Sequence, residues 1–493
     1  MKKLMFFLIL FSVGILYCGN INMEGYLEGQ FWRTYNSENF EWDMQTPKLL
    51  VETRFHGSPM TNTNYYFKLY AETDYYDNDR PLALFSEGHI NFKQEKNGTG
   101  LSTTFFTREN GNYWTDGSML GILNTGSVDN DGNGQGVRVD AWHNHNGSMT
   151  YVFSDFSSGG GDDVHLFRYR QSFQESKINT GLFFQRKNYA TGMEKDFNQV
   201  VASDFKMRLG KYYISTEAAI SSTPSDSLIN ALNEEYHDEF KDVFKSNFAA
   251  KAEFSGFRIG SPKWGYWFFT PGVFTYGISY RNYMGDNQSN KFGYWINSYY
   301  HIPYRAITFT LNYNGSKLIE ADEFFVAEEE YYDDIRSYEP TTNLYSEIYI
   351  EFINGFKGKV SFNKKDEMWQ GSTYKHYDFF TELSVENRLA KLLTQFKVKD
   401  IGEIWEKQIA GIELSVNLTD KWRLFARGLV ANDRASSRNS IFGEIQYRFS
   451  GNAEFYLQYG PSWWGQWGLV NDDGFVSNGD MQKEIKLIIK GWF

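Results

Sequence analysis

The chain has 493 residues, a formal net charge of −12 and a mean hydropathy of −0.53. Its 61 acidic side chains outnumber the 49 basic ones, which argues against nucleic acid as a partner and favours cations or neutral solutes. Aromatic residues make up 18% of the chain and proline occurs nine times, a composition typical of β-strands. After the N-terminal segment, no apolar run reaches the ~20 residues of a membrane helix, so any membrane crossing would use strands.

The first 19 residues are predicted to be a secretory signal peptide. Lys2 and Lys3 form its basic start, and residues 4–17 are an uncharged stretch too short to span a bilayer. The chain is therefore expected to be exported, with residues 20–493 as the mature part. Cys18, the only cysteine, is either removed with the signal or lipidated, although residues 15–17 lack the small side chains that usually precede a lipoprotein cysteine.

From residue 20 onward, apolar and polar residues alternate in about 24 candidate strands, within a range of about 22 to 26. Each is roughly 9 to 14 residues long, which suits a tilted strand that crosses a bilayer. No linker or change in composition divides residues 20–493, so we predict one all-β domain, a single large antiparallel transmembrane β-barrel. The clearest apolar faces are Leu49, Val51, Thr53 and Phe55; Leu344, Ser346, Ile348, Ile350 and Phe352; and Ala453, Phe455, Leu457 and Tyr459.

Strand-like sequence begins near Asn22, so we expect no N-terminal plug domain of the siderophore-receptor type. A barrel of this size encloses a lumen wider than that of ordinary porins. We therefore expect its own loops, a partner or crowded side chains to fill it.

Short turns and long loops alternate along the chain. This asymmetry predicts short periplasmic turns, long extracellular loops, an even strand number and both termini in the periplasm. Short turns are predicted at residues 97–98, 146–147, 354–355, 419–420 and 451–452. Long loops are predicted at residues 109–134, 221–244, 314–341, 365–376 and 461–480.

The segment 129–140 has the oxygen spacing of a calcium loop. Its side chains at positions one, three, five, seven and twelve carry oxygen, and a glycine stands at position six. An aspartate replaces the usual final glutamate, no flanking helices are predicted, and Asp-Asn-Gly runs are also ordinary loop composition. A structural Ca²⁺ is the one cofactor that the sequence suggests. Its candidate ligands are Asp129, Asp131, Asn133, Gln135 and Asp140.

Two further loops have a distinctive composition. Residues 225–244 show helical spacing of apolar side chains, which suits either a constriction inside the lumen or a surface helix. Residues 320–334 are densely acidic, which would either attract cations to the mouth or serve only as a solvated loop.

Tryptophan is concentrated in two clusters, residues 264–269 and the group Trp463, Trp464 and Trp467. Exposed indole rings stack on sugar faces, so the second cluster is a candidate sugar-binding site. The alternative is an interfacial aromatic belt, which every membrane barrel needs.

Enzymatic motifs are weak, and we expect no enzyme. There is no nucleophile elbow, zincin motif or phosphate loop. His56 and Ser58 are spaced as in outer-membrane phospholipases, but His56 shares the polar face of Glu52 and Arg54 and a turn follows it.

The C-terminal strand closes this pattern. One face carries Phe493 and an apolar or small residue at every second position before it, whereas Glu484, Lys486 and Lys490 fall on the other. The strand resembles the terminal strand of bacterial outer-membrane proteins, a porin-like class in which a final Phe belongs to the signal read by the barrel-insertion machinery. This resemblance implies an outer-membrane location, contact with its lipid, and Phe493 as the insertion signal.

Alternation without catalytic motifs predicts a porin-like channel for passive passage of small hydrophilic solutes, with cations or neutral sugars favoured by the acidic loops. The alternative is a structural or assembly barrel whose lumen is filled by loops or by a periplasmic or surface partner protein. An outer-membrane hydrolase is the third possibility.

Overall fold

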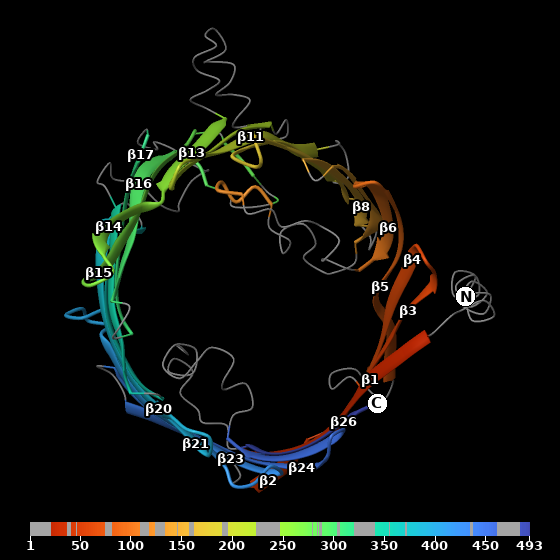
Figure 1. The fold of residues 1–493 in the computed structure, drawn as a ribbon. Helices are drawn as coiled ribbons and strands as arrows, with labels where there is room; N and C mark the ends of the chain where they lie inside the picture. Colours follow the sequence, from red (N-terminus) through yellow and green to blue (C-terminus); the bar gives the residue numbers. More distant parts are fainter. Residues whose placement is uncertain are drawn as a thin grey trace, which may run out of the picture.

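In a computed structural model, the chain forms one closed antiparallel β-barrel, which Figure 1 views along its axis. Its strands follow the alternating segments of the sequence, because alternation lets one face meet an apolar medium and the other face water. No helix among the described residues is long and apolar enough to cross a membrane. The structure describes residues 21–36, 41–45, 47–73, 81–108, 118–123, 134–144, 146–156, 162–189, 196–222, 247–278, 280–282, 284, 288–302, 306–319, 341–353, 355–369, 372–433, 437–460 and 484–493.

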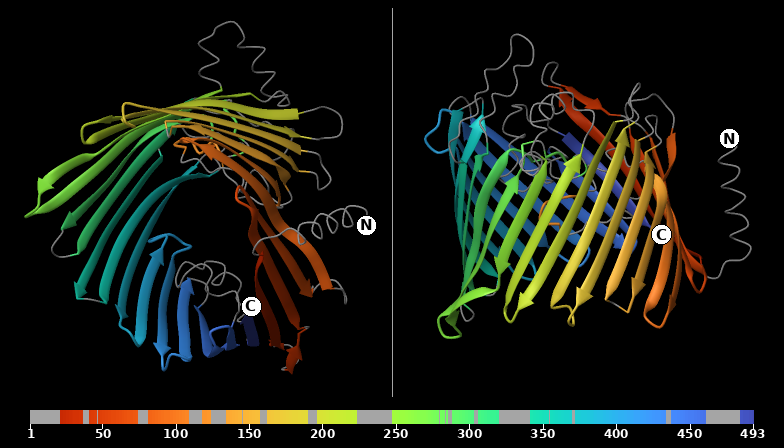
Figure 2. Two further views of the ribbon diagram at one scale, coloured as in Figure 1. Left: turned by 45° about the vertical axis from the view of Figure 1, so that its right-hand side comes forward. Right: turned by 90° about the horizontal axis from the view of Figure 1, so that it is seen from above.

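The strands are tilted relative to the barrel axis, as the side views in Figure 2 show. In chain order they are β1 (Ile21–Asn36), β2 (Glu41–Met44), β3 (Lys48–Met60), β4 (Thr63–Thr73), β5 (Pro81–Lys96), β6 (Thr99–Thr107), β7 (Gln135–His143), β8 (Gly147–Phe156), β9 (Asp162–Phe173), β10 (Ile178–Tyr189), β11 (Asp196–Leu209), β12 (Tyr212–Ser222), β13 (Phe248–Ser255), β14 (Phe257–Ser261), β15 (Gly265–Tyr276), β16 (Lys291–Ile302), β17 (Ile307–Leu318), β18 (Thr341–Ile353), β19 (Phe356–Trp369), β20 (Ser372–Glu386), β21 (Ala390–Lys399), β22 (Lys407–Asn417), β23 (Trp422–Asp433), β24 (Ser437–Ser450), β25 (Ala453–Tyr459) and β26 (Glu484–Trp492).

The 26 segments make a barrel of 24 strands, because two strands are each broken once. Segments β2 and β3 follow one another along β1, and β13 and β14 follow one another along β15. Strand β1 also pairs with β26, which closes the ring at the seam. The predicted fold class and strand number are confirmed.

The predicted faces are also confirmed. Leu49, Ile348 and Leu457 are 47%, 45% and 40% exposed, as expected for side chains that point away from the lumen. Their sequence neighbours, such as Glu52 and Glu347, form ion pairs with the polar side chains of adjacent strands. These strands therefore separate an apolar outer face from a polar inner face.

The short turns lie at the end of the barrel that also holds the first and last described residues. Asn97 and Gly98 have φ angles of 53° and 77°, the two left-handed residues of a type I′ hairpin turn. Longer connections, including residues 108–134 and 460–483, join strands at the opposite end. The predicted alternation of turns and loops is confirmed here.

One predicted loop, residues 365–376, is wrong. Strands β19 and β20 remain paired through Trp369 and Ser372, so the connection between them is short. The segment looks like a loop because charged residues occupy its outward positions. Lys364 and Asp366 form an ion pair at 3.2 Å on that outer face, and Thr342 of β18 donates to Asp366 at 2.6 Å. Polar side chains suit an outer face where a strand extends past its apolar belt.

Candidate functional site

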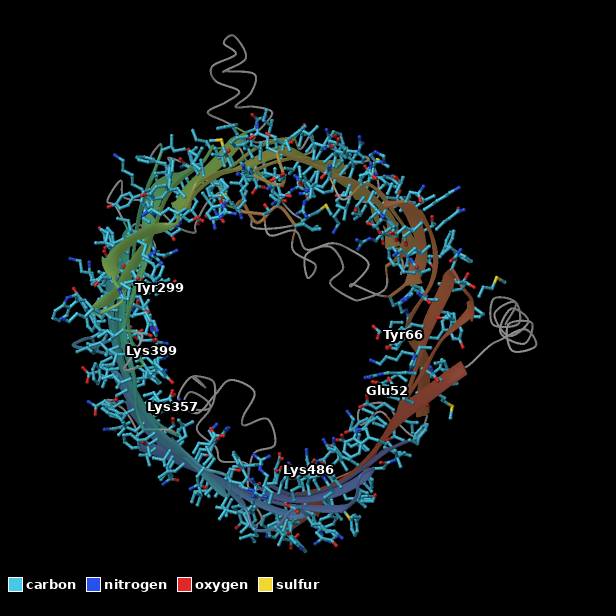
Figure 3. All side chains as sticks on the ribbon, viewed as in Figure 1. Glu52, Tyr66, Tyr299, Lys357, Lys399 and Lys486 are labelled. Carbon is cyan, nitrogen blue, oxygen red and sulfur yellow. The ribbon has the colours of Figure 1, made fainter. Side chains whose placement is uncertain are left out.

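The candidate functional site is the lumen, whose wall carries ladders of opposite charges. On β3 to β5, the Nζ atom of Lys68 lies 3.1 Å from Glu52 and 3.7 Å from Glu87. Arg54 reaches Glu52 at 2.5 Å, and the Tyr66 hydroxyl donates to Glu87 at 3.2 Å. Figure 3 shows Glu52 and Tyr66 pointing into the barrel. Cross-strand pairs of this kind stabilise the sheet and keep the inner surface wettable.

Other parts of the wall carry similar pairs. Lys359 of β19 lies 2.9 Å from Glu347 of β18, and Arg427 of β23 lies 2.6 Å from Glu413 of β22. Charges of both signs thus surround the lumen. Three further lysines that point into it in Figure 3 are Lys357, Lys399 and Lys486.

Two sectors of the wall depart from this pattern. In one, Ile409, Leu429 and Phe442 of β22 to β24 form a buried apolar cluster. In the other, the inward side chains of β8 to β13 are apolar and two chain segments cover them. We call residues 118–123 and 280–282 the lumenal shelf; the first of these is the orange segment inside the ring in Figure 1. In the shelf, Leu120 and Ile122 are 0% and 2% exposed. The wall beneath contributes the buried side chains Val152, Leu166, Phe183, Val200, Ala219 and Ala249.

Glu217 of β12 fixes the first shelf segment to the wall. Its carboxylate accepts hydrogen bonds from the Ser118 hydroxyl at 2.6 Å and from the backbone N–H groups of Met119 at 2.5 Å and Leu120 at 3.2 Å. The Glu217 side chain is buried, with 6% of the residue exposed. A buried carboxylate is stable in such a place only when several donors surround it.

Asn282 joins the two shelf segments. Its amide nitrogen donates to the carbonyl oxygens of Gly121 at 3.2 Å and Ile122 at 3.1 Å, and its amide oxygen accepts from Gln185 of β10 at 2.6 Å. Asn282 and Gln185 are both fully buried. The shelf is therefore a packed part of the barrel interior. Folded-in loop segments are one of the three fillers that the sequence left open.

A cavity of about 510 Å³ lies between the first shelf segment and strands β9 to β13. Charged side chains of both signs line it, including Arg170, Lys206 and Glu253, and Arg168 pairs with Asp204 at 2.5 Å. Its volume is in the range of sites that hold small molecules. The shelf thus creates a recess of solute size in the lumen wall.

The seam between β1 and β26 holds Phe493. Its backbone N–H donates to the carbonyl of Gly25 at 3.1 Å, and its carbonyl accepts from the Gly25 N–H at 2.7 Å. The Phe493 ring lies over Gly25, where an added Cβ would stand 2.1 Å from the ring. The terminal aromatic is therefore part of barrel closure, and its role as an insertion signal stays a prediction.

The outer face carries aliphatic side chains all round the barrel and an aromatic cluster near the short turns. Leu182, Ile412 and Ile441 are 55%, 50% and 61% exposed. The Trp267 ring lies 5.5 Å from Tyr300 and 5.7 Å from the ring of Phe309, as expected for an interfacial belt. A continuous apolar outer face around a polar lumen suits a bilayer and not water. The chain is a bacterial outer-membrane β-barrel.

Comparisons with known proteins give low structural similarity alone. No family model matches the chain, and no curated protein matches it in sequence. The siderophore receptor PirA from Pseudomonas aeruginosa is similar, with 10% identity, a TM-score of 0.47, and coverage of 96% of this chain and 80% of that one. The siderophore receptor PirA from Acinetobacter baumannii has 8% identity and a TM-score of 0.44, with coverage of 97% of this chain and 81% of that one. The copper transporter OprC has 9% identity and a TM-score of 0.43, with coverage of 97% of this chain and 81% of that one.

Two of the predicted calcium ligands are described, and both lie in β7. Gln135 begins this strand and Asp140 follows five residues later, so at ~3.3 Å per residue they stand roughly 17 Å apart. The Asp140 carboxylate also accepts from Arg138 at 2.8 Å and from Thr150 at 2.7 Å. These two residues do not converge on one ion, because β7 is extended where a calcium loop curls.

The other predicted ligands, Asp129, Asp131 and Asn133, lie outside the described residues, and a site made by them stays a prediction. Replacing both aspartates, Asp129→Ala with Asp131→Ala, is expected to abolish a calcium-dependent rise in Tm of the purified protein, since carboxylates supply most of the affinity for Ca²⁺. Asp140→Asn should leave that rise intact. If calcium does not raise the Tm of the parent protein, the predicted calcium site is wrong.

Several other predicted features fall on segments outside the described residues. Trp463, Trp464 and Trp467, the helical segment 225–244 and the acidic segment 320–334 all lie outside the described residues. Within the described part, no group of three His, Cys, Asp or Glu side chains is arranged to hold a metal. Because its three tryptophans lie outside the described residues, the sugar site stays a prediction.

The shelf was not predicted from the sequence. One signal was present: residues 119–123, Met-Leu-Gly-Ile-Leu, are an apolar run inside an otherwise polar loop. A second was the break in alternation at inward positions such as Val152 and Val200, both fully buried. Neither signal shows that the two surfaces meet.

Proposed function

We propose that this protein is an outer-membrane channel for passive passage of small hydrophilic solutes, with the lumenal shelf narrowing the path. One observation carries the proposal: charged and polar side chains line much of the inner wall, interrupted by the sector under the shelf and by a buried apolar cluster of β22 to β24. Such a surface lowers the cost of keeping a solute hydrated. The recess under the shelf gives the solute a place to pause.

We further infer that the channel favours cations or neutral sugars over anions. The described wall carries paired charges of both signs, so it gives no strong preference by itself. The acidic residues of the segment 320–334 would tip the balance by concentrating cations at the mouth.

Planar-bilayer recording with the purified protein tests both statements. Stable conductance steps are expected, with a reversal potential in a KCl gradient that shows preference for K⁺. Replacing Glu328, Glu329 and Glu330 by glutamine should reduce this preference while leaving the step size similar, and it should fade at high salt. A barrel that inserts without conducting would contradict the channel, and would favour a structural or assembly barrel filled by its loops or a partner.

A further inference from the structure

Strand β14 has a free edge at the periplasmic end of the barrel. Among the described strands it pairs only with β15, whereas β13 pairs with both β12 and β15. The neighbouring hairpin of β11 and β12 turns back at Gly210 and Lys211, before it reaches the level of β14. Figure 2 shows the β14–β15 hairpin, in light green, projecting from the rim.

Gly256 explains why the strand leaves its neighbour there. Its φ angle is +89°, in the left-handed region, and an added Cβ would stand 2.2 Å from the carbonyl oxygen of Lys211. Only glycine allows both this bend and this close approach. The bend ends the pairing of β13 with β12 at Ser255 and leaves β14 to continue alone beside β15.

The free edge is short and held in place from its other side. Five residues, Phe257–Ser261, pair in continuous register with β15. The hairpin turn is tied to the barrel by the Tyr300 hydroxyl, which donates to the carbonyl of Trp264. An ordered strand with an open row of N–H and C=O groups is a template for another strand.

Side chains around the edge define what would bind. Phe257 and Ile259 lie on one face, and Ile259 is 68% exposed. Arg258 lies on the other face, 4.3 Å from the ring of Tyr266, and Lys263 lies 5.4 Å from the ring of Trp264. The two faces thus offer apolar contact on one side and positive charge on the other.

We propose that β14 is a docking edge for an extended acidic segment of a periplasmic protein, which adds as a strand beside Phe257–Ser261. Its backbone would pair with the free edge of β14. Its alternate side chains would be apolar toward Ile259 and acidic toward Arg258, and Lys211 at the adjoining turn adds a further positive charge. This site lies outside the lumen and does not depend on conduction.

Fluorescence anisotropy with labelled peptides of about ten residues, a full strand length, tests the proposal. A peptide of alternating Glu and Val is expected to bind the detergent-solubilised protein at least about tenfold more tightly than one of alternating Lys and Val. The same acidic peptide, N-methylated at every residue, should lose binding because neither of its edges can then donate hydrogen bonds to β14. Equal binding of the N-methylated peptide would overturn strand addition, and absence of binding by the acidic peptide would overturn the docking edge.

A charge reversal gives the matched test. The double variant Arg258→Glu with Lys263→Glu should bind the acidic peptide more weakly and the basic peptide more tightly. Lys421→Glu, at the exposed β22–β23 turn, should change neither affinity. Unchanged preference in the double variant would overturn the proposed acidic partner. Heat-modifiable electrophoretic mobility of each variant verifies that the barrel is folded.

Discussion

Glu217→Ala is expected to release the first shelf segment from the lumen wall. The substitution leaves the backbone N–H groups of Met119 and Leu120 without their carboxylate acceptor. Each hydrogen bond to a charged group contributes ~1.5–3 kcal/mol, so the loss of these two backbone bonds alone removes about 3–6 kcal/mol from the docked state. Conductance is expected to rise and open-channel noise to increase.

The balance of energies explains why one side chain decides the state of the shelf. Burial of Leu120, Ile122 and Leu123 contributes ~1.5–3 kcal/mol each, or roughly 5–9 kcal/mol together. Ordering the backbone of residues 118–123 costs about 1–2 kcal/mol per residue, or roughly 6–12 kcal/mol. The free energy gained from apolar burial therefore roughly equals the entropic cost of ordering the segment. The hydrogen bonds of Glu217 and Asn282 provide the net stabilisation of the docked state.

Cysteine labelling measures this release directly, because Cys18 is the only native cysteine and lies in the predicted signal segment. In a Leu123→Cys background, maleimide should react slowly when Glu217 is present and at least about tenfold faster with Glu217→Ala, as a shift of 1.4 kcal/mol or more would give. Glu253→Ala removes a carboxylate that lines the same cavity but is the control, since its loss leaves the shelf bonds intact. Equal labelling rates in all three proteins would contradict the role of Glu217.

Deletion of Phe493 is expected to reduce the folded barrel in the outer membrane several-fold. The deletion removes two backbone hydrogen bonds to Gly25 at the seam, along with the predicted insertion signal. Heat-modifiable mobility in outer-membrane fractions measures the folded amount. Phe352→Ala is the matched control, because Phe352 is also an outward aromatic near the periplasmic rim, with 57% exposure against 53% for Phe493.

Gly25→Val separates the two contributions of Phe493. The variant keeps the terminal aromatic but forces its ring off the seam, since a side chain at Gly25 would overlap it. If closure depends on this packing, Gly25→Val assembles poorly as well. Normal assembly of Gly25→Val together with failure of the deletion would assign Phe493 to the insertion signal alone. Normal assembly of both would contradict the prediction.

The sequence alone determined the barrel. Strand alternation has a period of two residues, so a window such as Leu344–Phe352 shows both faces without knowledge of its neighbours. The hairpin at Asn97 and Gly98 is equally local, because only residues that tolerate positive φ form that turn. The loop predicted at residues 365–376 was wrong because outward polar side chains on paired strands resemble a loop in sequence.

Only the tertiary structure decided what lies inside the barrel. Glu217 and Leu120 are separated by 97 positions, and Asn282 and Gly121 by 161, yet each pair is hydrogen-bonded. Nothing in the local sequence specifies such contacts, since they depend on which sector of a closed wall each loop faces. The free edge of β14 also depends on tertiary structure. Gly256 permits the bend, but the edge is open because the β11–β12 hairpin turns back before it reaches β14. Local alternation fixes the wall of this protein, and closure of the ring fixes its interior and its rim.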